Sequence, residues 1–115
     1  MLMDEAEKSL MRYASTNKPT FVKSLLESKV NIESSDKFGL TSLIGASENG
    51  YIEVVRILLE FKANINAKTC FGRTALMQAS RYVHVEVVSL LLSPDRSIKA
   101  NVDAFTFDNW TSLMF

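Results

Sequence analysis

The 115-residue chain has few of the residues on which many functional sites depend. Its one cysteine, Cys70, excludes both an intramolecular disulfide and an all-cysteine zinc site. Its single histidine, His84, excludes a histidine-rich metal cluster, and its four glycines form no phosphate-cradling loop. These shortages argue against an enzyme, a metalloprotein and a nucleotide-binding protein. We therefore expect no catalytic residue, no cofactor and no metal.

Charge and hydropathy narrow the class of partner. The 13 Lys and Arg side chains balance the 13 Asp and Glu side chains, whereas nucleic-acid binders usually carry a basic excess. No run reaches the roughly 18 apolar residues that a membrane span needs. Residues 1–5 do not begin a basic segment followed by an apolar stretch, so no signal peptide is visible. We therefore expect no nucleic-acid or membrane partner, and a cytoplasmic or otherwise intracellular location.

Three short strings of residues recur in one register. Two of them repeat after 33 and then 37 residues, and the third repeats twice after 33. The strings lie at residues 41–44, 74–77 and 111–114; at 29–32, 62–65 and 99–102; and at 22–26, 55–59 and 88–92. A period of this length is typical of a solenoid built from stacked units. The longer last step places extra residues in the segment 93–98, which is either tolerated loop growth or a secondary contact loop.

Each unit has the pattern of two short helices, most clearly in residues 36–68. Thr41 can accept a hydrogen bond from a free backbone amide, so it predicts the start of a helix over about residues 42–48. Gly50 predicts the end of that helix, because glycine enters the left-handed conformation at low cost. A second helix is expected over about residues 52–60, with an apolar stripe that one unit is too small to bury. Stacking of several units would cover this stripe.

These residues resemble the ankyrin repeat. The resemblance is carried by the 33-residue period and by residues 39–43 (GLTSL) and 50–55 (GYIEVV), and it covers residues 4–115. It implies an all-α solenoid of stacked helix-turn-helix units with hairpin-like loops, with about three full repeats plus the start of a fourth. We expect a single domain over residues 1–115, with units at about 4–35, 36–68, 69–105 and an incomplete 106–115.

Some residues depart from the family pattern. Lys29, Lys62 and Lys99 stand where a glycine normally closes the second helix. We expect the asparagine that follows each lysine to adopt the left-handed conformation instead, because asparagine tolerates it. Val83 replaces the glycine between the two helices of the third unit. Since a β-branched residue is poor at positive φ, we expect a modified turn there.

The two ends of the stack differ. The first unit has a charged face on its leading helix and Pro19 at the first turn of its second helix, so we interpret it as a cap. The fourth unit stops at Phe115, early in its first helix. Either the chain is part of a longer repeat protein, or this uncapped terminus docks on another copy and the protein self-associates.

The resemblance implies protein binding through a concave surface formed by the hairpin tips and the exposed side of the first helices. The family's variable contact positions fall on Lys37, Phe38, Leu40, Glu48, Asn49, Cys70, Phe71, Arg73, Arg81, Tyr82, Phe107, Asp108 and Trp110. Several of these are aromatic residues or arginine, the types enriched at binding hot spots. For Phe38 and Phe71 the alternative is packing between neighbouring hairpins. We interpret Cys70 as a passive contact, with a reactive thiol as the alternative, and His84 as a contact at a helix start or turn.

We therefore predict a non-enzymatic interaction module that binds one folded protein partner, whose identity the sequence does not specify. A narrower alternative is an inhibitor or regulatory subunit that occludes an enzyme's active site with the same surface. A third is a structural spacer in a longer repeat protein. The spacer predicts that substituting the aromatic and arginine side chains changes no interaction.

Overall fold

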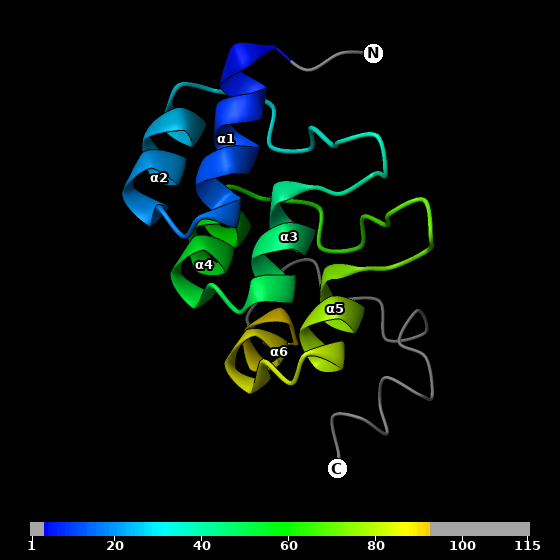
Figure 1. Ribbon diagram of the computed structural model, residues 1–115. Helices are drawn as coiled ribbons and strands as arrows, with labels where there is room; N and C mark the ends of the chain where they lie inside the picture. The colour runs from blue at the N-terminus through cyan, green and yellow to red at the C-terminus, as the bar shows by residue number, and fades with distance from the viewer. Residues whose placement is uncertain (1–3, 93–115) are drawn as a thin grey trace.

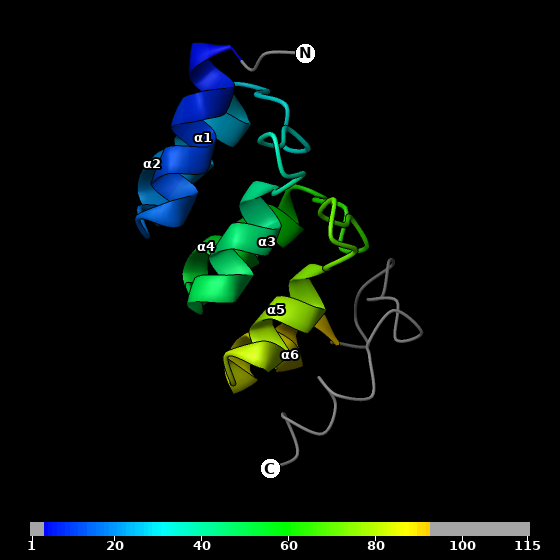
Figure 2. The ribbon, with the colours of Figure 1, turned by 45° about the vertical axis from the view of Figure 1, so that its right-hand side comes forward.

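A computed structural model describes residues 4–92, in which helices are paired and stacked in chain order (Figure 1). The helices are α1 (Glu5–Ser15), α2 (Pro19–Glu27), α3 (Ser42–Asn49), α4 (Ile52–Glu60), α5 (Ala75–Arg81) and α6 (Val85–Leu91). Helices α1, α3 and α5 form one row beside the connecting loops, and α2, α4 and α6 form a second row (Figure 2). Residues 4–92 contain no strand, only an isolated antiparallel bridge between Ser35 and Thr41. The predicted all-α solenoid is confirmed.

Threonine side chains start α3 and α5, as the repeated Thr predicts. The Oγ1 of Thr41 accepts a hydrogen bond from the Ile44 amide, and the Oγ1 of Thr74 accepts one from the Met77 amide, each at 3.3 Å. Each bond satisfies a backbone donor that has no partner within the helix. Helix α3 runs one residue further than expected and ends at Gly50, whose φ of 74° is left-handed. Helix α4 covers the predicted residues 52–60.

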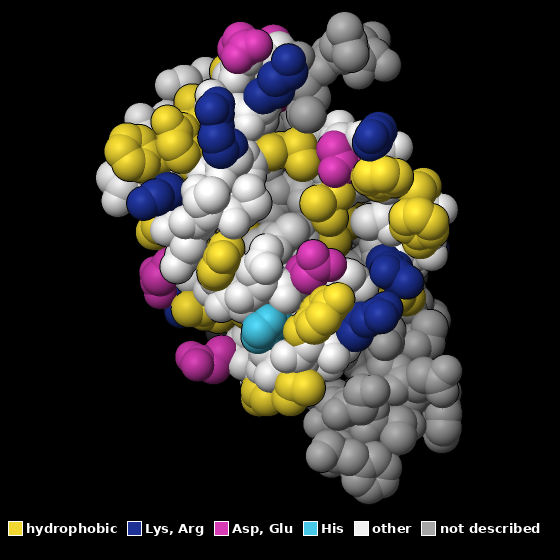
Figure 3. Space-filling model, viewed as in Figure 1, with side chains coloured by type: hydrophobic (Ala, Val, Ile, Leu, Met, Phe, Trp, Pro, Cys, Tyr) yellow, Lys and Arg dark blue, Asp and Glu magenta, His cyan; other side chains and the backbone are white. Residues whose placement is uncertain are grey.

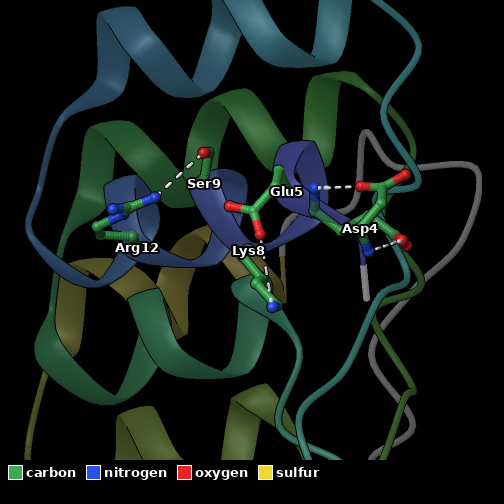
Figure 4. Close-up of polar contacts among 6 residues, drawn as sticks. Asp4, Glu5, Lys8, Ser9 and Arg12 are labelled. Atoms are coloured by element: carbon green, nitrogen blue, oxygen red, sulfur yellow. Dashed lines mark hydrogen bonds and ion pairs between the residues drawn. The ribbon is translucent and has the colours of Figure 1, made fainter. Parts of the chain in front are cut away.

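Helix α1 is longer than α3 because a different residue begins it. The Oδ1 of Asp4 accepts a hydrogen bond from the Glu7 amide at 2.8 Å, and a Glu7 carboxylate oxygen accepts one from the Asp4 amide at 3.1 Å (Figure 4). This reciprocal capping box starts α1 at Asp4. The equivalent position of the second unit, 33 residues later, is Lys37, which lies in a loop. The Lys8–Glu5 ion pair, 3.6 Å long, lies on the exposed face of the added turn. The first unit therefore replaces a loop tip with a charged helical turn.

The left-handed residues after α2 and α4 are the lysines themselves, so the prediction that the following asparagines take this role is wrong. Lys29 has a φ of 67° and Lys62 a φ of 69°. The chain must turn at once, because the amide of the residue after each lysine donates a hydrogen bond back to the last helical turn, at 3.4 and 3.0 Å. Asn31 and Asn64 each lie two residues after the lysine, beyond this turn. The side chain of each asparagine instead accepts a backbone hydrogen bond of 3.0 Å in the turn that follows. Lys99 lies outside the described residues.

The turn between α5 and α6 is not modified, which corrects the second expectation. Val83 has a φ of 60°, close to the values of 58° for Asn17 and 74° for Gly50 at the equivalent positions. Its hydrogen bonding also matches, since the His84 amide donates to the Ala79 carbonyl at 2.8 Å and the equivalent pair of the second unit lies at 3.0 Å. The third unit therefore keeps the common turn even with a β-branched residue at the left-handed position.

Leucine and valine side chains of the second helices form the centre of the core. Leu58 of α4 and Leu91 of α6 are fully buried at equivalent positions. Leu25, their equivalent in α2, is only partly buried. Phe21 of α2 lies outward, 53% exposed, and stacks on Tyr13 with ring centroids 4.9 Å apart. Each second helix therefore packs both on the first helix of its own unit and on the second helix of the adjacent unit.

The described residues cover the first two predicted units and the third as far as Leu92. Phe107, Asp108 and Trp110, the segment 93–98, the fourth unit and the expected self-association through the C-terminal end all lie outside them. Each pair of helices falls within one predicted unit. The unit boundaries themselves stay predictions.

Candidate protein-binding surface

Two loop tips, residues 36–40 and 69–73, are built in the same way by different side chains. The Oδ1 of Asp36 accepts hydrogen bonds from two amides of its own loop, at 2.9 and 3.0 Å. The Oγ1 of Thr69 accepts two in the next loop, each at 3.2 Å. Such side-chain bonds to nearby amides stabilise tight turns. Each tip is therefore ordered before any partner binds, and each exposes a phenylalanine, Phe38 or Phe71.

The two tips contact each other. The Cys70 amide donates a hydrogen bond to the Phe38 carbonyl at 2.8 Å, and the Phe38 and Phe71 rings stack with centroids 6.4 Å apart. Gly39 permits this approach, since a Cβ there would lie 3.0 Å from the Cys70 nitrogen. The rings thus pack between neighbouring loops, as one alternative expected. Phe38 nevertheless stays 48% exposed and Phe71 68% exposed, so both remain available to a partner.

A cation lies over each of three exposed rings. The pairs are Lys37 over Phe38 at 5.2 Å, Arg73 over Phe71 at 5.7 Å and Arg81 over Tyr82 at 5.8 Å, measured from the charged group to the ring centre. We call these six residues the cation–ring surface. Each exposed contact of this kind is worth about 0.5–1 kcal/mol. Figure 3 shows Lys and Arg side chains beside hydrophobic ones on the right-hand side, over the loops that precede α3 and α5.

Residues 10–114 match a family model described as ankyrin repeats, in three copies. The chain belongs to the ankyrin repeat family. Ankyrin repeats are generally protein–protein interaction modules and are typically non-enzymatic. No curated protein matches the chain.

Three candidate residues of the second ankyrin repeat differ in how freely they can contact a partner. Glu48 is partly buried, and its carboxylate accepts a hydrogen bond of 2.5 Å from Gln78 of the third repeat. Leu40 is partly buried and packs on the core. Asn49 is exposed, and its side-chain amide donates to the Gly45 carbonyl at 2.9 Å. The link from Glu48 to Gln78 was not predicted, because the two residues are 30 positions apart and share no motif.

His84 joins the same two ankyrin repeats from the start of α6. Its Nε2 lies 2.8 Å from the Glu48 carbonyl oxygen, and since a carbonyl can only accept, Nε2 carries the hydrogen. The ring fills the space beside Gly50, where an added Cβ would lie 2.5 Å from Nδ1. His84 therefore makes a structural contact at a helix start.

Cys70 is exposed, and its backbone amide donates a hydrogen bond to the Phe38 carbonyl of the neighbouring tip.

A second apolar surface lies on the α4–α6 side and was not among the predicted contacts. Val83 and Val85 are 56% and 57% exposed at the turn into α6. Val85 and Ile52 line two neighbouring hollows of about 310 and 400 Å³. A β-branched residue at an outward position of a helix, such as Val85, is the sequence signal that could have marked this surface.

Residues 4–92 hold no group of three or more His, Cys, Asp or Glu side chains that could bind a metal ion. None of the helices in this part of the chain is both long and apolar enough to cross a bilayer.

Proposed function

We propose that this ankyrin repeat domain binds a folded protein partner through the cation–ring surface and the adjacent C-terminal ends of α3 and α5, where Asn49 and Arg81 are exposed. The observation that supports the proposal is the exposure of three aromatic rings, Phe38, Phe71 and Tyr82, by about half or more. Complete burial of a phenylalanine side chain is worth about 1.5–3 kcal/mol, so each ring can contribute about 1 kcal/mol when a partner covers it.

The rigidity of the surface adds to this support. The tips are held by Asp36, by Thr69 and by the hydrogen bond from the Cys70 amide to the Phe38 carbonyl. A surface that is already ordered loses less conformational entropy on binding. The rings are spread over two loop tips and the end of α5, and this breadth suits a protein better than a small molecule.

Matched double variants test the proposal. Phe71→Ala with Tyr82→Ala removes two rings of the surface, and Phe21→Ala with Val85→Ala removes similarly exposed apolar side chains from other faces. Circular dichroism and thermal unfolding should show that both variants fold. A partner captured from native lysate and then measured by calorimetry should bind the ring variant at least about tenfold more weakly, and the control variant as the unmodified chain.

Equal retention of every captured protein by the ring variant would contradict the proposal and favour the spacer alternative. Once a partner is identified, its own activity should be assayed with and without the domain. Loss of that activity on binding identifies the inhibitor alternative, and unchanged activity identifies a simple interaction module.

A further inference from the structure

Carboxylates in the loops and at the end of α3 are already engaged inside the domain. Asp36 accepts two amides of its own loop. Glu48 accepts the Gln78 side chain at 2.5 Å, and Glu33 accepts the Asn64 amide at 2.6 Å. A carboxylate that accepts hydrogen bonds keeps its charge, but it has fewer oxygens to offer to an external group. These acidic side chains are therefore structural.

Within residues 4–92, the cations of the cation–ring surface form no ion pair with an acidic side chain. The ion pairs found in residues 4–92 both lie within single helices, α1 and α4. Lys37, Arg73 and Arg81 are exposed and lie over rings instead. A ring contact leaves the N–H donors of a cation able to bind an anion. The surface thus offers three positive charges that form no ion pair with a described carboxylate.

The rings narrow the kind of anion that fits. Phe38 has Lys37 over it at 5.2 Å and Phe71 stacked at 6.4 Å, so these neighbours restrict the space for a base to stack on it, although the ring stays 48% exposed. Nucleobases bind aromatic residues by stacking on free ring faces, and a chain of net charge zero lacks the basic excess of a phosphate-binding protein. The edge of an aromatic ring carries partial positive charge, which suits a carboxylate or an apolar side chain. A peptide that combines both fits better than nucleic acid.

We infer that the partner presents an acidic segment to this surface, with Asp or Glu interspersed among apolar side chains. Its carboxylates pair with Lys37, Arg73 and Arg81, and its apolar side chains cover the rings. The planar guanidinium of each arginine can donate two parallel hydrogen bonds to one carboxylate. The inference rests on the proposed function and adds to it the charge and composition of what is bound.

The test is a library of random loops displayed on a small folded scaffold and selected against the full chain. We expect the selected loops to be enriched in Asp and Glu beside apolar residues. Combined substitution of Lys37→Gln, Arg73→Gln and Arg81→Gln should weaken the binding of a selected loop about tenfold or more, because three ion pairs are lost. Binding should also weaken as salt is raised, since exposed charges are screened.

A matched control removes three exposed cations from elsewhere. Lys18→Gln, Lys23→Gln and Lys29→Gln change the net charge by the same amount around α2. The affinity of a selected loop for this control should stay within about twofold of that of the unmodified chain. Equal losses in the two triple variants would overturn the inference, because a general charge effect would then explain both.

The remaining outcomes separate this inference from the proposed function. Neutral or basic loops that lose affinity with Phe71→Ala and Tyr82→Ala would overturn the acidic partner and leave the proposed surface intact. Selected loops that are insensitive to both rings would overturn the proposed function itself. Single-stranded DNA or vesicles of anionic lipid that bind as tightly as the acidic loops would identify a general polyanion site, and would also overturn the inference.

Discussion

Val83 allows the strain in a repeat turn to be measured directly. It is a β-branched residue with a φ of 60°, where a left-handed L-residue costs roughly 1–2 kcal/mol. Its side chain is mostly exposed, so removing it loses little burial. Substitution by glycine removes the strain, but it lowers the free energy of unfolding by about 0.5–1 kcal/mol because the unfolded chain gains conformational freedom. We therefore expect Val83→Gly to raise the free energy of unfolding by about 1 kcal/mol.

Val83→Asn separates the strain from the entropy of the unfolded chain. Asparagine tolerates the left-handed region and keeps a Cβ, and Asn17 already occupies the equivalent position with a φ of 58°. This variant should gain about 0.5–1 kcal/mol. Val83→Ala is the control, because alanine keeps a left-handed Cβ and should change stability by less than about 0.5 kcal/mol.

Urea unfolding followed by circular dichroism gives these differences from the midpoint and slope. The reverse substitution, Gly50→Val, should lose more than Val83→Gly gains, because its Cβ would lie 2.5 Å from the His84 Nδ1. If Val83→Gly and Val83→Asn both lower the free energy of unfolding, the valine side chain stabilises the turn and the strain argument is wrong.

Three further perturbations test the packing and the capping of the stack. Gly45→Ala should raise the free energy of unfolding in urea by about 0.5–1 kcal/mol, because the position is inside α3 and a Cβ would meet only Leu40, at an ordinary 3.8 Å. Leu58→Ala should lower it by about 2–5 kcal/mol by the same measurement, because Leu58 is fully buried between units. The pKa of Glu7 is lowered by the hydrogen bonds from the Ser34 hydroxyl and the Asp4 amide, so its stabilising contribution is complete above the ordinary carboxyl pKa and is lost as the pH falls through the lowered value. An NMR titration should show the Glu7 pKa rising toward its ordinary value in Ser34→Ala, and an unchanged pKa would contradict this assignment.

The repeat register predicted the helices because the residues that delimit them recur with it. Thr41 and Thr74 cap α3 and α5 through equivalent hydrogen bonds, and Gly50 ends α3. The pattern of one unit therefore predicted the positions of the helices in the next unit. These are local effects in which a side chain acts on the backbone within a few residues.

Two predictions were wrong because the turn, and not the side chain, decides the backbone conformation at these positions. Lys62 and Val83 adopt left-handed φ because the chain must turn at that residue, whatever side chain is there. The bond from Gln78 to Glu48 links residues 30 positions apart, and no local pattern encodes it. The exposure of Phe38 and Phe71 could be inferred from their place at loop tips, but their mutual stacking depends on how closely two repeats approach.

The hydrogen bond from the Cys70 amide to the Phe38 carbonyl couples the mechanics of neighbouring loops. Moving one tip relative to the other would break this bond and separate the stacked Phe38 and Phe71 rings, so both contacts favour a single edge formed by the two tips. A ligand that touches either loop first therefore meets the second already aligned, and docking needs no sequential search. Shape selectivity is the consequence, since such an edge accepts only those contours that match both tips at once.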